Sequence, residues 1–95
     1  MRREFSEIAK VLLRERKRRG FSQLQLARAI GYKNGQIISN TERGLAGIPA
    51  EKIHELCVKL HTNPIHFISA SIKDYEDNLR RIYMSTVPPS IPTNN

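Results

Sequence analysis

Residues 19–44, RGFSQLQLARAIGYKNGQIISNTERG, decide how this chain folds. Ser22 and Gln25 form a capping-box pattern, in which each side chain binds the backbone N–H of the other residue, so a helix begins after Ser22. Gly31 ends that short helix and Gly44 ends another, because glycine readily adopts the left-handed conformation that closes helices. The segment therefore predicts two short helices joined by a tight turn.

The turn contains Asn34-Gly35, the dipeptide most typical of a β-hairpin, since both residues tolerate a positive φ. The flanking residues do not alternate between apolar and polar, so no pair of strands is predicted. We interpret Asn34 as a candidate cap of the helix that follows. Gly35 is expected to shape the turn through its conformational freedom.

Apolar spacing predicts three more helices outside this segment. The first covers residues 5–19 and ends at Gly20. Pro49 opens another, and Asn63 and Pro64 cap and start the last one, which no glycine or proline interrupts over residues 65–84. The chain is thus predicted to be an all-α domain of five helices.

The last helix carries apolar residues at alternating steps of three and four, which is a heptad pattern. The first two of these residues are expected to complete the core. The other four extend beyond what such a core requires, and an exposed apolar stripe is typical of a partner surface, so we assign them to dimerisation. The alternative is that this helix folds back along its own domain. The residues of the pattern are Ile65, Ile68, Ile72, Tyr75, Leu79 and Ile82.

The predicted organisation has three parts. Residues 1–71 form the helical domain, and residues 72–84 form an amphipathic helix that extends it. Residues 85–95 are polar and rich in proline, without periodicity, and are expected to be a disordered tail.

Charge and cysteine content narrow the function. The 95 residues carry a net charge of +7, and residues 1–20 hold eight basic and three acidic side chains. Such a localised positive field suggests a polyanionic partner, with nucleic acid first and an anionic membrane surface second. One cysteine excludes an intramolecular disulfide, and no apolar run approaches a membrane span. We therefore expect a soluble cytoplasmic protein that does not enter a membrane.

Catalytic and metal chemistry find little support. His54, Cys57 and His61 are spaced like the beginning of a metal site, but no fourth ligand lies at a zinc-type spacing. Serine, histidine and acidic residues lack the context of a nucleophile elbow or a triad. We therefore expect that the chain is not an enzyme and that it needs no metal or cofactor.

The deciding segment resembles the Cro/lambda-repressor-like (Xre-type) family of helix-turn-helix DNA-binding proteins. The match covers residues 9–63, and several of its spacings are fixed. It implies a five-helix lambda-repressor-like DNA-binding domain whose third helix, at about residues 34–43, enters the major groove. The matching residues are Arg19-Gly20-Phe21-Ser22-Gln23, Leu26-Ala27, Ile30-Gly31, Ile38-Ser39, Glu42, Gly44 and Pro49.

The resemblance also implies roles for single residues. Amides and hydroxyls on an exposed helix can read base edges, and the family's base-reading positions fall on Gln36 and Asn40. Ser39 is expected to contact a base or a phosphate. Backbone-contact positions and the turn that precedes the helix add Gln23, Lys33, Asn34, Gly35 and Arg43. Gln23 is also expected to brace the recognition helix.

Arg16 and Glu42 match a pair that forms a partly buried salt bridge between the first and third helices.

The sequence departs from the family in two places. The spacing from Gly31 to Ser39 is one residue longer than usual, which places an insertion in the turn. Thr41 stands where an apolar residue usually packs, and we expect its hydroxyl to bond back to the preceding helical turn.

Together these features predict a transcriptional regulator that binds double-stranded DNA, as a homodimeric repressor on a palindromic operator. Two alternatives stay open. One is an antitoxin, whose C-terminal helix or tail masks a toxin. The other is an RNA-binding regulator, for which Tyr32 is the one aromatic residue considered for base stacking.

Overall fold

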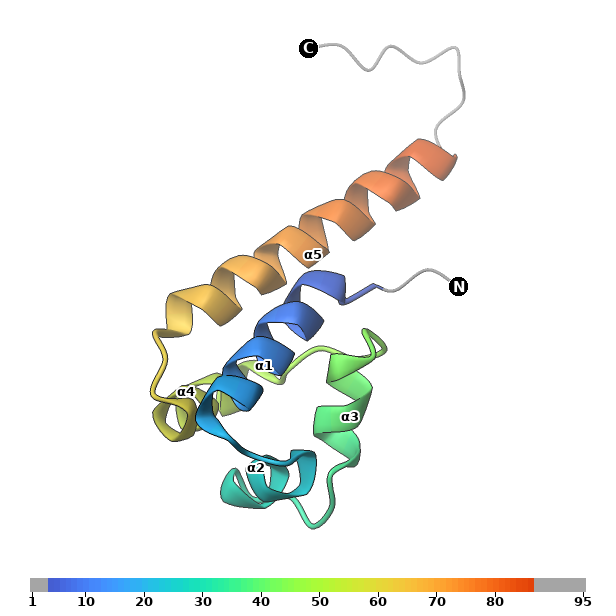
Figure 1. Cartoon of the computed structure of the whole chain (residues 1–95). Helices are drawn as coiled ribbons and strands as arrows, with labels where there is room; N and C mark the ends of the chain where they lie inside the picture. Colours follow the sequence, from blue (N-terminus) through green and yellow to red (C-terminus); the bar gives the residue numbers. More distant parts are fainter. Residues whose placement is uncertain (1–3, 87–95) are drawn as a thin grey trace.

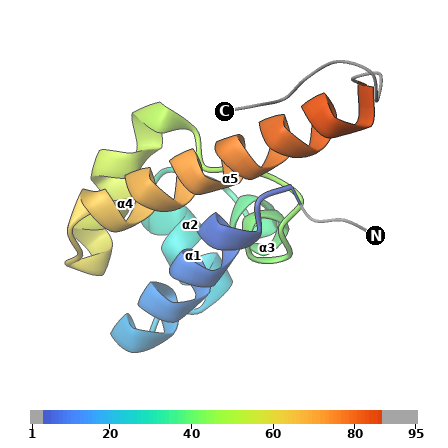
Figure 2. The same ribbon diagram turned by 90° about the horizontal axis from the view of Figure 1, so that it is seen from above.

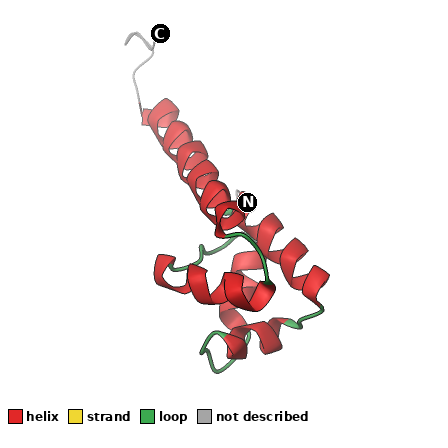
Figure 3. Ribbon diagram, turned by 90° about the vertical axis from the view of Figure 1, so that its left-hand side faces the viewer, coloured by secondary structure: helices red, strands yellow, loops and turns green. Residues whose placement is uncertain are grey.

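The computed structural model describes residues 4–86, which form five α-helices and one short 3-10 helix, η1. No strand occurs within this range, as Figure 3 shows. The all-α, five-helix class predicted from the sequence is confirmed. The elements are α1 (Ser6–Arg19), α2 (Gln23–Ala29), α3 (Gln36–Glu42), η1 (Ala50–Lys52), α4 (Ile53–Leu60) and α5 (Pro64–Thr86).

Local capping signals place the helix ends. The backbone N–H of Gln25 donates to Ser22 Oγ at 3.0 Å, and the Ser22 N–H donates to Gln25 Oε1 at 2.8 Å, so the predicted capping box is confirmed. Asn63 Oδ1 accepts the N–H of Ile65 at 3.0 Å and caps α5 as expected. Pro49 precedes η1, so the α-helix predicted to open at Pro49 begins only at Ile53.

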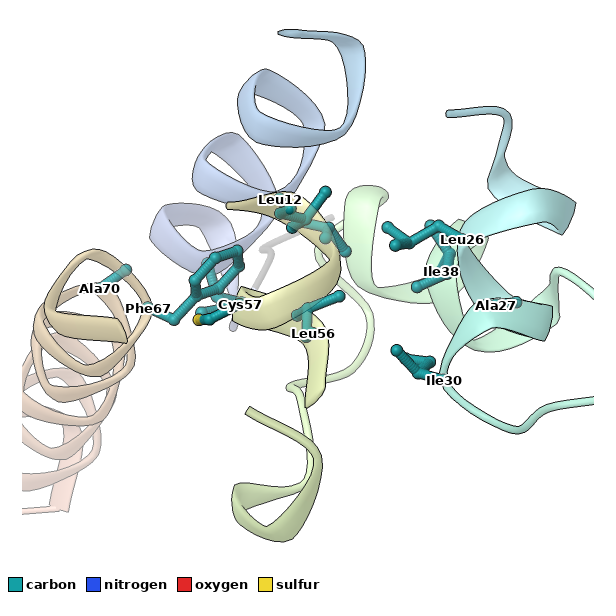
Figure 4. Packing of buried hydrophobic residues seen from close by; sticks show 11 residues of the cluster. Leu12, Leu26, Ala27, Ile30, Ile38, Leu56, Cys57, Phe67 and Ala70 are labelled. Atoms are coloured by element: carbon teal, nitrogen blue, oxygen red, sulfur yellow. The ribbon is translucent and has the colours of Figure 1, made fainter. Parts of the chain in front are cut away.

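One hydrophobic core joins all five helices. Figure 4 shows its side chains converging from α1, α2, α3 and α4, with Phe67 pointing into the cluster from α5. Burying each large apolar side chain contributes about 1.5–3 kcal/mol relative to leaving it exposed. The core therefore fixes α3 against α1 and α2. Its members are Ile8, Leu12, Leu26, Ala27, Ile30, Ile38, Leu56, Cys57, Leu60, Phe67 and Ala70.

Helix α5 packs on the domain through a different face from the one predicted. Ile65 and Ile68, expected in the core, are 52% and 41% exposed, and that prediction is wrong. Phe67, Ala70 and Asp74 are buried in their place. Phe67 fills the space between the helices, and the Asp74 carboxylate makes hydrogen bonds that no apolar residue could make.

A clamp at the start of α1 explains why Asp74 is buried. Phe5, the residue before α1, offers no side-chain cap. The Asp74 carboxylate instead accepts the N–H groups of Glu7 and Ile8, both at 2.9 Å. Asn78 Nδ2 donates to the Glu4 carbonyl at 2.6 Å. Helix α5 therefore caps α1 from outside and runs antiparallel to it (Figures 1 and 2).

Helix α5 is continuous across the boundary predicted between residues 71 and 72. It ends at Thr86, two residues beyond the predicted end, so residues 85 and 86 belong to the helix and not to the tail. Residues 87–95 of the predicted tail lie outside the described residues. The last turns of α5 project past the other helices (Figure 1).

The heptad residues of α5 form an uncovered surface, here named the α5 stripe. Their exposed fractions lie between 41% and 70%. The stripe is thus separate from the face that packs on α1. Within residues 4–86, no helix combines the length and the apolar character needed to cross a bilayer. The stripe consists of Ile65, Ile68, Ile72, Tyr75, Leu79 and Ile82.

Candidate nucleic-acid interface

The turn before α3 packs tightly against the start of α2. Gly35 holds the N-cap position of α3, and Asn34, one residue before it, accepts the N–H of Gln36, the first residue of the helix, on its Oδ1 at 3.0 Å. Gly35 has φ −82°, so the expected use of its unusual backbone freedom is wrong. Its value is spatial, because a Cβ at Gly35 would lie 3.3 Å from the backbone nitrogen of Leu24. The lengthened turn fits because it lies against α2 without a side chain at this point.

Helix α3 has one buried face and one face open to solvent. Ile38 and Thr41 are fully buried. Thr41 Oγ1 donates to the Ile37 carbonyl at 2.8 Å, so the predicted bond to the preceding turn is confirmed and the buried hydroxyl is satisfied. Four polar side chains lie on the other face, exposed or half-buried, as their helical spacing predicted: Gln36, Ser39, Asn40 and Arg43.

Hydrogen bonds organise the open face of α3 into a row. Gln36 Nε2 donates to Asn40 Oδ1 at 2.8 Å, and Arg43 Nη2 donates to the same oxygen at 2.7 Å. Among residues 4–86, the Asn40 amide nitrogen and the Gln36 amide oxygen make no hydrogen bond. The row therefore holds three side chains together and keeps donors and an acceptor available for an external partner.

A buried ion-pair network fixes α3 from behind. The Arg16 guanidinium binds both oxygens of Glu42, with Nε to Oε2 at 2.5 Å and Nη2 to Oε1 at 2.9 Å. The two side chains are only 10% and 6% exposed, which confirms the predicted pair. Hydrogen bonding to Glu42 raises the pKa of Arg16 above its ordinary value, although burial alone would lower it. Arg16 Nη1 also donates to the Phe21 carbonyl at 2.8 Å.

Gln23 extends this network to α2. Its Nε2 donates to Glu42 Oε1 at 3.0 Å, so the predicted brace is confirmed. One carboxylate thus joins α1, α2 and α3 at the end of the helix that carries the polar row. Because the pair and its hydrogen bonds have defined directions, they restrict how α3 can tilt or rotate.

The turn places a second basic group beside α3. Lys33 is exposed, and its carbonyl accepts a hydrogen bond from Arg28 Nε at 3.3 Å. Tyr32, the one aromatic residue considered for base stacking, is half-buried against the core, with Lys52 Nζ 5.3 Å from its ring centroid. Lys52 Nζ also donates to the Ile30 carbonyl at 3.0 Å. This ring therefore belongs to the margin of the core.

His54, Cys57 and His61 line a hollow of about 330 Å³ beside α4. Across residues 4–86, no group of three or more histidine, cysteine or acidic side chains is close enough to hold a metal ion. Burial raises the pKa of the Cys57 thiol, and the negative charge of Glu15 raises it further. Cys57 is thus held as a protonated core residue.

Sequence reasoning missed two features of the structure. The link from Arg43 to Asn40 depends on side-chain rotamers, which no sequence pattern specifies. The Asp74 clamp had one signal, since an acidic residue lay at helical spacing from Phe67 and Ala70 on an otherwise apolar face.

The chain matches neither the protein-family models nor the curated proteins with which it was compared.

Proposed function

We propose that this chain is a sequence-specific DNA-binding regulator of transcription, which acts in the cytoplasm as a homodimeric repressor on a palindromic operator. In this proposal it is a member of the Cro/lambda-repressor-like family, and α3 is its recognition helix. The observation that carries the proposal is the hydrogen-bonded row of Gln36, Asn40 and Arg43 on the open face of α3.

The row has the chemistry that base reading requires. Glutamine and asparagine amides pair with adenine in the major groove through one donor and one acceptor. The bond between Gln36 and Asn40 holds Gln36 with its amide oxygen and one N–H open for such a pair, and it holds Asn40 with its amide nitrogen open as a donor. Arg43 and Lys33 supply positive charge at the two ends of α3, where phosphates flank the groove. In this arrangement α3 reads bases and the two cations position it.

The Arg16–Glu42–Gln23 network would serve the same purpose from the protein side. It ties α3 to α1 and α2 through one carboxylate. A recognition helix that rotates by a small angle moves its side chains away from the base edges they read. The network therefore has a positional role, which fits the general finding that buried ion pairs add little net stability.

Selection of bound sequences from a random duplex pool tests the proposal. We expect a palindromic motif whose half-sites lie about 34 Å apart, one turn of DNA, because two copies of α3 must enter successive major grooves. Replacing Gln36 or Asn40 with alanine should weaken binding to the selected site by about 1–3 kcal/mol and relax the base preference.

His66→Ala, on the exposed surface of α5, is the matched control and should leave the preference unchanged. A pool that yields no motif would contradict sequence-specific reading. A Gln36→Ala/Asn40→Ala double variant that discriminates as well as the parent chain would contradict the assignment of α3. Tighter binding to a structured RNA than to any duplex DNA would favour the RNA-binding alternative.

A further inference from the structure

The α5 stripe presents more apolar surface than a monomer ordinarily leaves in water. Its six large side chains follow one line along about 25 Å of helix. Half-exposed side chains of this size expose several hundred Å² in total, which reaches the largest patches found on monomeric proteins, about 300–600 Å². Glu76 is the exposed charged residue that helical spacing places nearest to the stripe, and it lies beside the stripe and not within it.

A hollow of about 420 Å³ continues this surface towards the domain. It lies between α5, the start of α1 and the loop that contains Gly47. Phe5 and Ile48 give it apolar walls, and Tyr75 belongs both to the hollow and to the stripe. The rest of its lining is partly polar and includes Glu4, Asp74 and Asn78. Stripe and hollow together approach the area of about 800 Å² per partner that a standard protein interface buries.

We propose that a second copy of this chain covers the α5 stripe, and that the two α5 helices pair antiparallel about a two-fold axis near residues 73 and 74. The alternating spacing of the stripe is symmetric about that point. An antiparallel pair therefore faces Ile65 with Ile82, Ile68 with Leu79, and Ile72 with Tyr75. Every apolar side chain of the stripe meets another one.

The edges of the stripe select this orientation. When two identical helices pair antiparallel, each long edge of the stripe lies beside the same edge of the other copy. When they pair parallel, each edge lies beside the opposite edge of the other copy. In the antiparallel pair, Glu76 stays at the solvent-exposed rim, on the edge away from the hollow, where its ion pair with Arg80 at 2.9 Å can be kept.

The opposite edge gives the same answer. Tyr75 and the hollow lie next to the two-fold axis, so the two hollows face each other and their apolar walls are covered. A parallel pair would instead place the edge that carries Glu76 against the hollow, whose lining includes the acidic residues Glu4 and Asp74 beside Phe5 and Ile48, and would bury a further negative charge there. Such a burial is unfavourable without a partner of opposite sign.

The pairing gives the proposed regulator its two-fold symmetry. Its role in reading an operator rests on the proposed function, whereas the pairing itself is tested without DNA. Because Asp74 and Asn78 clamp α5 to α1, an α5 pair would hold the two domains, and so the two α3 helices, at a fixed separation.

Sedimentation of the full chain over a range of concentrations tests the pairing. We expect a dimer, and we expect Ile72→Glu or Leu79→Glu to shift it to monomer with unchanged helicity, because both side chains are exposed within one copy. Met84→Glu is the matched control, since Met84 is 66% exposed on another side of α5, and it should leave the dimer intact. A parent chain that stays monomeric, or a Leu79→Glu variant that stays dimeric, would overturn the proposal.

Single cysteines then decide the orientation, in a Cys57→Ala background. Ile68→Cys mixed with Leu79→Cys should form a disulfide between the two different variants, while Ile68→Cys alone should crosslink poorly. Two copies of residue 68 lie about 16 Å apart in the antiparallel pair, too far for a disulfide. Efficient crosslinking of Ile68→Cys to itself would show a parallel pair. A dimer without any selected DNA motif would leave the pairing standing and contradict only the proposed function.

Discussion

Glu42 is the residue on which the candidate interface most depends, through its carboxylate. It accepts hydrogen bonds from Arg16 and Gln23, and it lies directly beside Arg43 of the polar row. The resemblance to the Cro/lambda-repressor-like family implied this pair, because Arg16 and Glu42 match two positions that form a salt bridge in that family. The hydrogen bond from Gln23 Nε2 to Glu42 Oε1 connects a third helix, α2, to this pair.

Removing one partner of this pair should cost far more than removing both. Arg16→Met leaves a buried carboxylate without its guanidinium, and we expect the free energy of unfolding to fall by about 3–5 kcal/mol. Adding Glu42→Leu should recover much of that loss, since two apolar side chains can pack together. Urea denaturation measures both variants.

Arg80→Met breaks an exposed pair with Glu76 and serves as the control, with an expected cost below about 1 kcal/mol. If Arg16→Met cost no more than this control, the buried network would not hold α3. The double variant should fold and still show a reduced base preference, because the network fixes the direction of α3.

The Cys57 thiol should be chemically inert while the domain is folded. Its side chain is buried in the core, and its pKa is raised by that burial and then by the charge of Glu15. The thiolate is the reactive form, so a raised pKa and exclusion from water both slow its modification. Reaction with Ellman's reagent at neutral pH should be slow in buffer and fast in urea.

Val58→Cys supplies the comparison for this measurement, because Val58 is 54% exposed on the same helix. In a Cys57→Ala background its thiol should react at once without denaturant. Equal rates for the two thiols in the folded state would mean that the core around Cys57 opens readily.

The sequence predicted which segments form helices, but it did not predict the face through which α5 packs on the other helices. Caps such as Ser22 with Gln25, and Asn63 before Pro64, act within a few residues, so the sequence contains the whole interaction. Helix α5 has two faces with helical spacing, and periodicity alone favoured the more continuous one. The face that docks includes Asp74. An acidic residue is not predicted to be buried from the sequence, because its hydrogen-bond partners on α1 are known only from the structure.

The clamp between α5 and α1 makes a testable contribution to stability. Asp74→Ala removes an acceptor from two N–H groups at the start of α1, and buried donors without partners cost about 1–3 kcal/mol. We therefore expect a clear loss in the free energy of unfolding, measured with urea. Asp77→Ala is the control, because Asp77 is exposed and, among residues 4–86, its ion pair is with Lys73. Similar losses for both variants would contradict the clamp.

At the scale of the whole molecule, the uneven charge predicts how binding responds to salt. The eight basic side chains of residues 1–20 lie in one part of a chain with net charge +7. Each phosphate that such a protein neutralises lowers the slope of log K against log salt by roughly 0.9. We expect steep weakening with salt for operator and random DNA alike.

Lys33→Ala isolates one of these contacts. It should reduce the salt slope by about 1 and weaken all duplex sequences equally, because a phosphate contact carries no base information. Lys59→Ala, an exposed lysine on α4, should change neither quantity. A Lys33→Ala variant with altered base preference would place Lys33 among the base-reading residues instead.

The Asp74 clamp also has a consequence for the order of folding. The cap of the first helix comes from a residue 66 and 67 positions later in the chain. During synthesis, at about 5–20 residues per second, α1 must wait several seconds for Asp74 to be made. Contacts of such long range form late and slow the approach to the native state. Helix α5 therefore completes a domain whose first helix was made long before, and a nascent chain that stops short of Asp74 would leave the start of α1 frayed.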